Sequence, residues 1–474
     1  MSDRDAYCIP EKQEVYTNMC KKTIKYVLPL LICLVFLVTL IPGCKEEAPV
    51  TVTATATKTT TATATATTTV KPTPSPSPSP SPTPKPTPPA QNEIVIGASR
   101  DITGPMAGFQ AFGFAAVYRM WAEEVNAAGG IDVAGKKLKV RIIEYDDGSD
   151  PAAVARNVEK LATQDKIDFL FGPTGTASLF AAAPIANKYK KIMICGEGGA
   201  TTLEPKLPDM PYIFSVLNYS NHFQIPVFTD IVVAEGAKTA YICYMADLHG
   251  AEYYLTAQSE FTQKGITVVG STSIPPTITD LNPIIQEAKR LNPDIFCMFA
   301  YPPNNILFMQ TVLALDYSPK VILIGPGCNF EFFNLMFGAA LEGVMGEGAW
   351  NRKSSTGANA FADKLLAAVE LPNMDWWGAL VYYSSLQFFQ QAIEKAASLD
   401  VDKVRAVMAT AHFQTALGEM WWDIHGEAGG GLLPQACYAG QIGQWQNGIF
   451  EIIDPGSKRT AEPIYPKPDW PAAP

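Results

Sequence analysis

Glu-Ile-Val-Ile-Gly-Ala at residues 93–98 and Phe-Gly-Pro-Thr-Gly-Thr-Ala-Ser at residues 171–178 enclose the stretch of sequence that decides the fold. Between them, short apolar runs alternate with longer amphipathic ones. The pattern predicts strands at 94–98, 139–145 and 169–172, and helices at 113–127 and 151–164. Alternation of this kind is typical of strand-helix-strand units that build a parallel sheet.

The same rhythm continues along the chain and then restarts. After a helix at 178–189 and a strand at 192–195, we expect strands at 239–244, 267–271 and 294–299 and a helix at 251–264. About 380 residues follow Gln91, more than one core normally serves, so the sequence predicts an α/β protein with two doubly wound parallel sheets. Ligands of such sheets bind beyond the carboxyl ends of the strands.

Two helices and a hairpin are expected after the second sheet. Residues 358–369 and 380–397 have helical periodicity and are rich in Ala, Leu and aromatic residues. Residues 438–453 are expected to form a hairpin that turns at Asn447-Gly448, because Asn-Gly is a strong two-residue turn signal.

Several motifs in this order and spacing resemble the leucine/isoleucine/valine-binding family of extracytoplasmic solute-binding proteins. They are Thr103-Gly104-Pro105, 121–130, 146–151, 171–178, Tyr301, Gly325-Pro326 and 417–426. The resemblance implies a type I periplasmic-binding-protein fold, in which two lobes are joined by a three-segment hinge and the helices at 358–369 and 380–397 rejoin the first lobe. We therefore expect lobe 1 at 92–216 and 349–417, and lobe 2 at 217–348 and 418–460.

The N-terminal residues carry the pattern of a secretory signal. Lys21, Lys22 and Lys25 precede an apolar run, 26–41, that ends at Pro42-Gly43-Cys44. The run is also long enough for a membrane-spanning helix, which is the alternative interpretation. Residues 41–44 resemble a lipoprotein cleavage box, so we expect a signal peptide at 1–43 and a lipid on Cys44 that anchors the protein outside the cytoplasm. Met19 is a second candidate for the initiator.

Residues 44–91 consist mostly of Thr-Ala, Pro-Ser and Pro-Thr repeats. A segment with so little apolar surface cannot offset its ordering entropy, so it is predicted to be disordered. Its proline half favours polyproline II, which makes it a tether between the anchor and the globular part. An unselected low-complexity insert is the alternative, and the sequence does not decide whether the hydroxyls carry sugars.

The first lobe is expected to hold one end of a small ligand. Residues 171–178 combine a strand end, a glycine-containing loop and a helix start, whose free N–H groups suit an anion such as a carboxylate. By resemblance, Thr176 contacts the ligand carboxylate, Ala200 and Thr201 form the second such position, and Phe109 lines the pocket. A helix cap with a tight turn is the alternative for any one of these loops.

Resemblance places Tyr301 of the second lobe on the ligand. His249 stands where the family often has Tyr, although a lone His is more often structural, and Trp377 matches a pocket position, although an aromatic turn is often core. The resemblance also implies an acidic residue for the ligand's ammonium where this chain has Gly327. We therefore expect an apolar or aromatic carboxylate or an amide in preference to a free amino acid, unless Glu197 or Glu331 replaces the missing acid.

Composition and motifs argue against several other functions. Without residues 1–43 the chain has 31 basic and 42 acidic residues, a net charge of −11, which disfavours nucleic-acid binding. Its four histidines have no metal-ligand spacing, and no nucleophile elbow or phosphate-binding loop is present, so we expect no enzyme, metal or cofactor. Resemblance implies delivery of the ligand to the permease and ATPase of an ABC importer, and a ligand-sensing ectodomain is the alternative.

Overall fold

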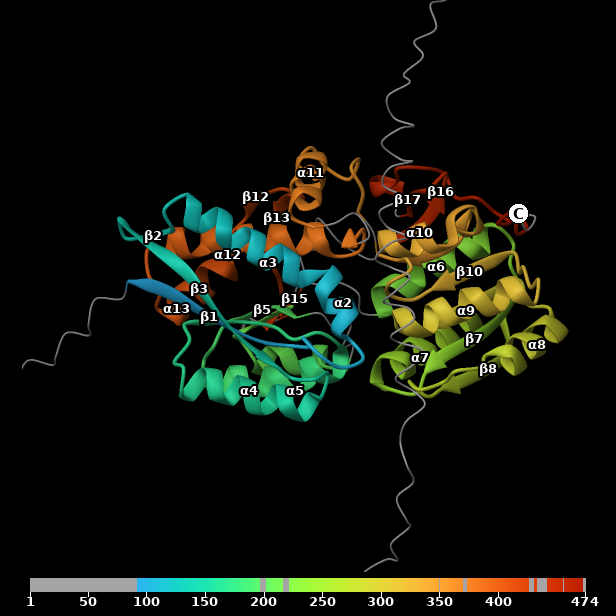
Figure 1. Cartoon of the computed structure of the whole chain (residues 1–474), viewed down its shortest axis with the longest axis horizontal. Coiled ribbons are helices and arrows are strands. Elements are labelled where there is room, and N and C mark those ends of the chain that lie inside the picture. The colour runs from blue at the N-terminus through green and yellow to red at the C-terminus, as the bar shows by residue number, and fades with distance from the viewer. Residues whose placement is uncertain are drawn as a thin grey trace, which may run out of the picture. The chain divides into compact units, whose positions relative to one another are not determined.

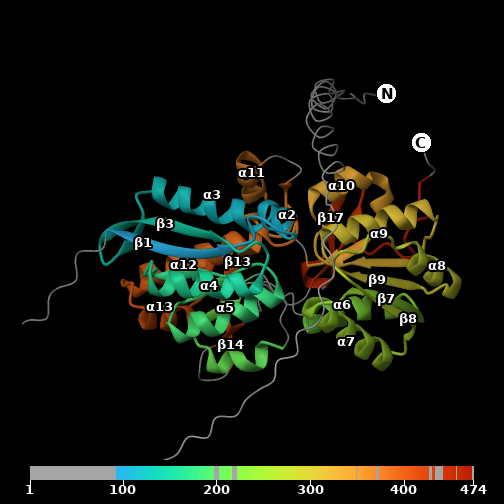
Figure 2. The same ribbon diagram turned by 60° about the horizontal axis from the view of Figure 1, so that its bottom comes forward.

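The computed structural model describes residues 92–474 except for 197–201, 216–220, 349, 370–372, 426–429, 433–440, 455 and 472–474. Within this part, two large sheets are present, each between two layers of helices (Figures 1 and 2). The expected α/β fold with two mostly parallel sheets is confirmed.

The first sheet has the strand order β14-β15-β6-β5-β4-β1-β3-β2 in the described residues. Its core strands are parallel, whereas β2 and β14 pair antiparallel with their neighbours. The strands are β1 (Glu93–Arg100), β2 (Ile131–Val133), β3 (Lys136–Asp146), β4 (Phe169–Phe171), β5 (Met193–Gly196), β6 (Ile213–Ser215), β14 (Asp423–His425) and β15 (Gly430–Leu432).

Helices cover both faces of this sheet because successive side chains of each strand point to opposite faces. Phe169 and Phe171 pack against one core, and Leu170 between them packs against the other. One layer is α4 (Pro151–Thr163) and α5 (Thr176–Lys188), and the other includes α3 (Phe114–Ala127), α11 (Ala358–Ala368) and α12 (Ala379–Ala396). The remaining elements of this part are α2 (Ala107–Phe112), η1 (Glu204–Asp209), α13 (Val401–Met408), β12 (Phe413–Thr415) and β13 (Gly418–Met420).

The second sheet has the order β17-β16-β11-β10-β9-β7-β8 among the described residues. Strands β8, β7, β9, β10 and β11 are parallel, and the β16–β17 hairpin closes the edge antiparallel. The strands are β7 (Thr239–Met245), β8 (Thr267–Ile274), β9 (Ile295–Phe299), β10 (Val321–Ile324), β11 (Met345–Glu347), β16 (Ile442–Gln446) and β17 (Ile449–Asp454).

Its helices also form two layers. Ile295, Cys297 and Phe299 face a core shared with α6 (Asn221–Ala234) and α7 (Leu248–Gln263), whereas Phe296 and Met298 face α8 (Asn282–Leu291) and α9 (Pro302–Ala314). The other helical turns are α10 (Glu331–Phe337), η2 (Gly338–Leu341) and η4 (Gly456–Lys458). The predicted turn is confirmed, because Asn447 and Gly448 both have positive φ, 51° and 73°, and connect β16 to β17.

Among the described residues, the chain passes between the two large sheets three times, and the last change comes later than predicted. We assigned residues 418–460 to lobe 2, yet β14 and β15 lie in the first sheet, where Gly431 of β15 pairs with Phe214 of β6. The return to the second sheet therefore falls after Leu432. The glycines at 430 and 431 lack the apolar alternation by which a strand is recognised. The other lobe boundaries stay a prediction.

Candidate functional site

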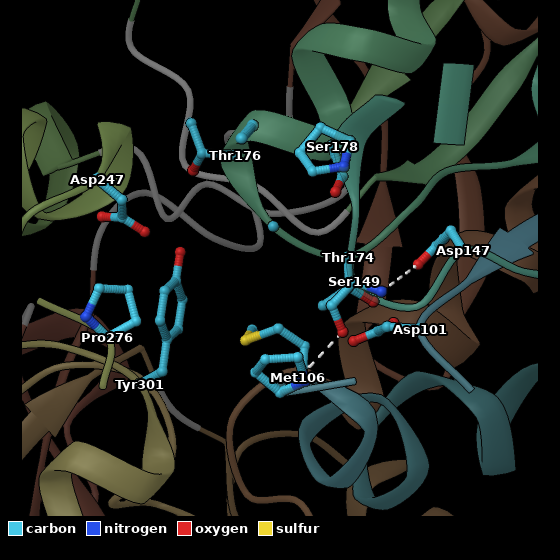
Figure 3. Close-up of a pocket in the computed structure, with 14 residues that line it drawn as sticks. Asp101, Met106, Asp147, Ser149, Thr174, Thr176, Ser178, Asp247, Pro276 and Tyr301 are labelled. Atoms are coloured by element: carbon cyan, nitrogen blue, oxygen red, sulfur yellow. Dashed lines mark hydrogen bonds between the residues drawn. The ribbon is translucent and has the colours of Figure 1, made fainter. Parts of the chain in front are cut away.

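A cavity of about 210 Å³ lies between residues of the two sheets. Its lining comes from loops that follow the carboxyl ends of β1, β3 and β4 in the first sheet and of β7, β8 and β9 in the second (Figure 3). The lining residues are Asp101, Pro105, Met106, Asp147, Ser149, Pro151, Thr174, Gly175, Thr176, Ala177, Ser178, Asp247, Pro276 and Tyr301. This is the edge at which doubly wound sheets bind ligands. The volume is below the roughly 300–1,000 Å³ of sites for drug-sized molecules, so the cavity suits a small solute.

Two first-lobe loops are held together by polar side chains. Asp146 accepts hydrogen bonds from the Thr103 amide at 3.0 Å and its hydroxyl at 2.7 Å, and from the Gly148 amide at 2.9 Å. Ser149 donates its hydroxyl to the Thr103 carbonyl and accepts from the Met106 amide, both at 3.1 Å. These bonds fix the loop after β1 against the loop after β3, so this wall of the cavity is pre-formed.

The third first-lobe loop presents the start of α5. Gly175 precedes the helix with φ 88°, and no side chain among the described residues caps the helix N-terminus. Thr176, Ala177 and Ser178, in the first turn, all line the cavity, and Thr176 is buried. Uncapped N–H groups and the positive end of the helix dipole favour an anionic group at this end of the cavity.

Two carboxylates line the first-lobe side. Burial raises the pKa of Asp101, opposed by the charge of Arg100 and the Thr174 hydroxyl. Burial also raises the pKa of Asp147, opposed chiefly by the Ser99 hydroxyl, which donates to it at 2.9 Å. Neither residue was a predicted site residue, although Asp101 comes three residues after the strand predicted at 94–98 and Asp147 two residues after the one predicted at 139–145.

The second lobe contributes Asp247 and Tyr301. Asp247 caps α7 by accepting from the Gly250 amide at 2.8 Å. The Tyr301 hydroxyl points towards Asp247 (Figure 3), and burial followed by the Asp247 charge raises the pKa of Tyr301. Gly250 is required here because a Cβ would lie 2.1 Å from the Met245 carbonyl oxygen.

His249 supports Tyr301 from behind and is not part of the cavity lining. Its ring stacks on the Tyr301 ring with centroids 5.2 Å apart and an interplanar angle of 23°. The centroid of the Tyr253 ring lies 4.6 Å from that of His249. Burial lowers the pKa of His249 to about 4, so the imidazole is neutral at physiological pH. A direct role of His249 on the ligand stays a prediction, and its position favours a role in orienting Tyr301.

The remaining predicted site residues are placed as follows. Thr176 and Tyr301 both line the cavity, and their contact with a ligand stays a prediction. Trp377 is buried in the first-lobe core, where its amide donates to Asp375 at 2.5 Å, and it does not line the cavity. Ala200, Thr201, Cys44 and the side chain of Phe109 lie outside the described part of the chain.

Gly327 has a structural reason for lacking a side chain. Its φ is 104°, and a Cβ would lie 2.5 Å from Cγ of Pro302. Of the two acids considered as replacements, Glu331 accepts from the Trp376 indole at 2.7 Å and lines a separate cavity of about 250 Å³ with Ile449 and Phe450. Glu197 lies outside the described residues.

A buried acid that the sequence analysis missed lies at the end of β11. Glu347 accepts from the Tyr253 hydroxyl at 3.2 Å, and burial raises its pKa to about 8. Its Oε1 lies 3.3 Å from where a Cβ of Gly325 would stand. Glu347 is therefore behind the second-lobe loops and outside the cavity lining.

The two lobes also touch directly. The Thr202 amide donates to Glu252 Oε1 at 3.1 Å, and the Thr202 hydroxyl donates to the same oxygen. Thr202 precedes β6 of the first sheet and Glu252 lies on α7 of the second lobe. This bond is close to the cavity, since Asp247 at the start of α7 is part of the lining.

Three further observations concern the described part of the chain. None of its helices is both long and apolar enough to cross a membrane. No group of three His, Cys, Asp or Glu side chains in residues 92–474, apart from the gaps given above, is arranged to hold a metal ion. Cys243, Cys297 and Cys328 are buried free thiols.

With this fold and cavity established, comparison with known proteins identifies the class. The family model described as periplasmic binding protein matches residues 93–445, and the chain belongs to that family. It is a family of binding proteins. This confirms the prediction of a binding protein and not an enzyme, and it confirms the prediction of an extracytoplasmic type of protein.

Individual relatives are more distant. The leucine-, isoleucine-, valine-, threonine- and alanine-binding protein of Pseudomonas aeruginosa is 25% identical over 350 residues, which cover 71% of this chain and 88% of the relative. Among solved structures, the branched-chain amino acid transporter substrate binding protein LivJ of Streptococcus pneumoniae, in complex with isoleucine, has a TM-score of 0.64 at 19% identity and covers 77% and 100% of the two chains. An ABC transporter solute binding protein of R. palustris, in complex with benzoate, has a TM-score of 0.63 at 18% identity and covers 76% and 95%. At these identities the solved structures establish the fold alone.

Proposed function

We propose that this protein is the solute-binding component of an ABC importer, which captures a small ligand between its lobes and delivers it to the permease and ATPase. The observation that carries the proposal is the cavity lined by six loops, three from each sheet. A ligand held by both lobes favours their closed arrangement, which is the form a permease would recognise.

The class of ligand is an amino-acid-like molecule, an amide, or an apolar or aromatic carboxylate. The start of α5 with Thr176 supports an anionic or polar acceptor at the first-lobe end, and Tyr301 and Met106 supply less polar surface. Relatives of this fold were solved with isoleucine and with benzoate, and both molecules carry a carboxylate.

Thr176 and Tyr301 are the residues most directly supported as ligand contacts. His249 is proposed to act through Tyr301, and Phe109, Ala200, Thr201 and Trp377 stay as proposals from family resemblance. Thermal-shift screening of the purified protein against amino acids, aliphatic amides and aromatic acids tests the function. We expect stabilisation by members of one class, and no stabilisation by any of them would contradict the proposal.

Anchoring by a lipid on Cys44, with residues 44–91 as a tether, is the second part of the proposed function. It is supported by the sequence at 41–44 alone. In a host that processes lipoproteins, Cys44→Ser should abolish metabolic labelling by palmitate. Equal labelling of the two forms would show that Cys44 is not the lipid site.

A further inference from the structure

Asp101 is the most unusual side chain of the cavity, because it is buried and its carboxyl group is not satisfied. Its exposed fraction is 3%, and neither carboxyl oxygen has a hydrogen-bond partner of good geometry among the described residues. Figure 3 shows the carboxyl end directed towards Met106 and Ser149, which line the same cavity. The Arg100 charge and the Thr174 hydroxyl only partly offset the cost of burying this carboxylate, so a ligand cation can stabilise it further.

The neighbouring cation does not satisfy Asp101. Arg100 donates from Nη1 to the Gly172 carbonyl at 2.7 Å, and its guanidinium lies 4.7 Å from the centroid of the Phe114 ring. The arginine is therefore directed into the first-lobe core. The charge of Arg100 only reduces the amount by which burial raises the pKa of Asp101.

The rest of the lining has the same sign of charge. Asp147 lies on the same side of the cavity and Asp247 on the other, and none of the described lining residues is Lys, Arg or His. Three carboxylates around one small cavity create a negative potential that favours a cation. Because the carboxylates are not arranged as a metal site within the described residues, an organic cation fits better than a metal ion.

The positive end of the cavity lies at α5. The uncapped first turn of this helix, including Thr176, lines the same cavity as Asp101. An N-terminus is equivalent to roughly half a positive charge and favours a carboxylate. The cavity therefore offers one site for an anion and another for a cation.

We propose that Asp101, a first-lobe residue, is the partner of the ligand's ammonium group when a zwitterion binds with its carboxylate at the start of α5. This inference rests on the proposed function and specifies its ligand class. It also accounts for Gly327: the acid that the resemblance placed on the second lobe is sterically excluded there, and Asp101 supplies the negative charge from the first lobe. The expected preference for a ligand without an ammonium is replaced by this proposal.

A matched set of probes tests it on the full chain. The aromatic set shares one side chain: phenylalanine carries both charged groups, 3-phenylpropanoate only the carboxylate and phenethylamine only the ammonium. Leucine, 4-methylpentanoate and isopentylamine form the corresponding aliphatic set. Calorimetry should show tightest binding of the zwitterion in at least one set, with the acid that lacks the amine at least about tenfold weaker, as expected for loss of a hydrogen bond between charged groups. This comparison needs no variant.

The variant Asp101→Asn keeps the shape of the side chain and removes its charge. It should lower affinity for the zwitterion about 10- to 100-fold and leave affinity for the amine-free acid nearly unchanged. Glu123→Gln is the matched control, because it removes one negative charge from an exposed position on α3 of the same lobe. It should change neither affinity.

Four outcomes would overturn the inference. They are tighter binding of an amine-free acid than of its zwitterion, equal affinity of Asp101→Asn and the natural protein for the zwitterion, stabilisation by Ca²⁺ or Mg²⁺ alone, and failure of every probe to bind. None of the four by itself contradicts the proposed function, which fails only if the wider thermal-shift screen also finds no ligand, so the two failures are distinguishable.

Discussion

At the scale of single residues, three aspartates of the lining give the cavity its negative charge, and Gly327, outside the lining, has no room for a further acid. Gly327 was identified from the family resemblance as a missing acid, but the reason, its positive φ and the proximity of Pro302, required the structure. Asp101 was overlooked, because burial and the orientation of Arg100 depend on how β1 packs against α3. Sequence patterns place such residues at the end of a strand but do not show which polar groups lack partners.

Asp101 should reduce the stability of the ligand-free protein at neutral pH. Burial raises its pKa in the folded state above that of the unfolded chain, so the stability gained by its protonation is present at low pH and lost as pH rises through the folded-state pKa. Asp101→Asn should therefore increase the free energy of unfolding at pH 7 by about 1 kcal/mol, and the gain should shrink towards pH 4. Urea unfolding at both pH values measures this. Destabilisation by Asp101→Asn at pH 7 would show that the carboxylate has a structural role instead.

Gly327 should not tolerate any side chain. In Gly327→Ala, the unfavourable φ and the approach to Pro302 should together cost about 2–4 kcal/mol of unfolding free energy. Gly236→Ala is the matched control, because Gly236 has φ +86° but an added Cβ there meets nothing within 4 Å, so the loss should be about 1 kcal/mol. Equal losses in urea unfolding would mean that Pro302 does not restrict this position. A Glu grafted at 327 is likewise expected to damage the fold before it changes specificity.

At the scale of elements, periodicity predicted most of the structure that positions the cavity. The helix expected at 151–164 is α4, which begins at Pro151 after the Asp150 side chain accepts from the Ala152 amide at 2.9 Å. The alternating runs at 169–172 and 294–299 became β4 and β9, whose carboxyl ends carry Thr174 and Tyr301. By contrast, β14 and β15 were missed, since three-residue strands with glycines at 430 and 431 gain their pairing from β6 and not from local pattern.

The start of α5 should contribute directly to affinity. Thr176→Ala removes a buried hydroxyl at the first helical position, and it should weaken binding by about 0.5–1.5 kcal/mol for a neutral hydrogen bond or about 1.5–3 kcal/mol for one to a charged group. Thr262→Ala, which removes an exposed hydroxyl near the end of α7, serves as the control and should have no effect. Calorimetry with the best solute decides, and unchanged affinity in Thr176→Ala would remove this residue from the site.

At the scale of the whole molecule, the two-lobe arrangement connects binding to motion. Both lobes line the cavity, and Thr202 and Glu252 join them beside it. The three changes of sheet were implied by family resemblance, because periodicity alone does not show to which sheet a helix returns. A ligand shifts the protein towards a closed state because the ligand makes contacts with both lobes only in that state.

Closure should be measurable in solution. In small-angle scattering of the chain from Gln91 onward, saturating ligand should reduce the radius of gyration. Glu252→Ala, which removes the Thr202 contact but does not line the cavity, should bind more weakly and show a larger radius without ligand. An unchanged radius at saturation in the natural protein would mean that binding does not close the lobes.

The central claim is that a small solute binds in the cavity between the two sheets. Isothermal titration calorimetry of the natural protein and of Tyr301→Ala, with the solutes found by thermal shift, tests this most directly, because Tyr301 reaches the cavity from the second lobe while Thr176 reaches it from the first. We predict saturable one-to-one binding that is weakened at least about tenfold in each of Tyr301→Ala and Thr176→Ala when the contact is charge-assisted. Binding that is as tight in both variants as in the natural protein would place the solute elsewhere and contradict the account.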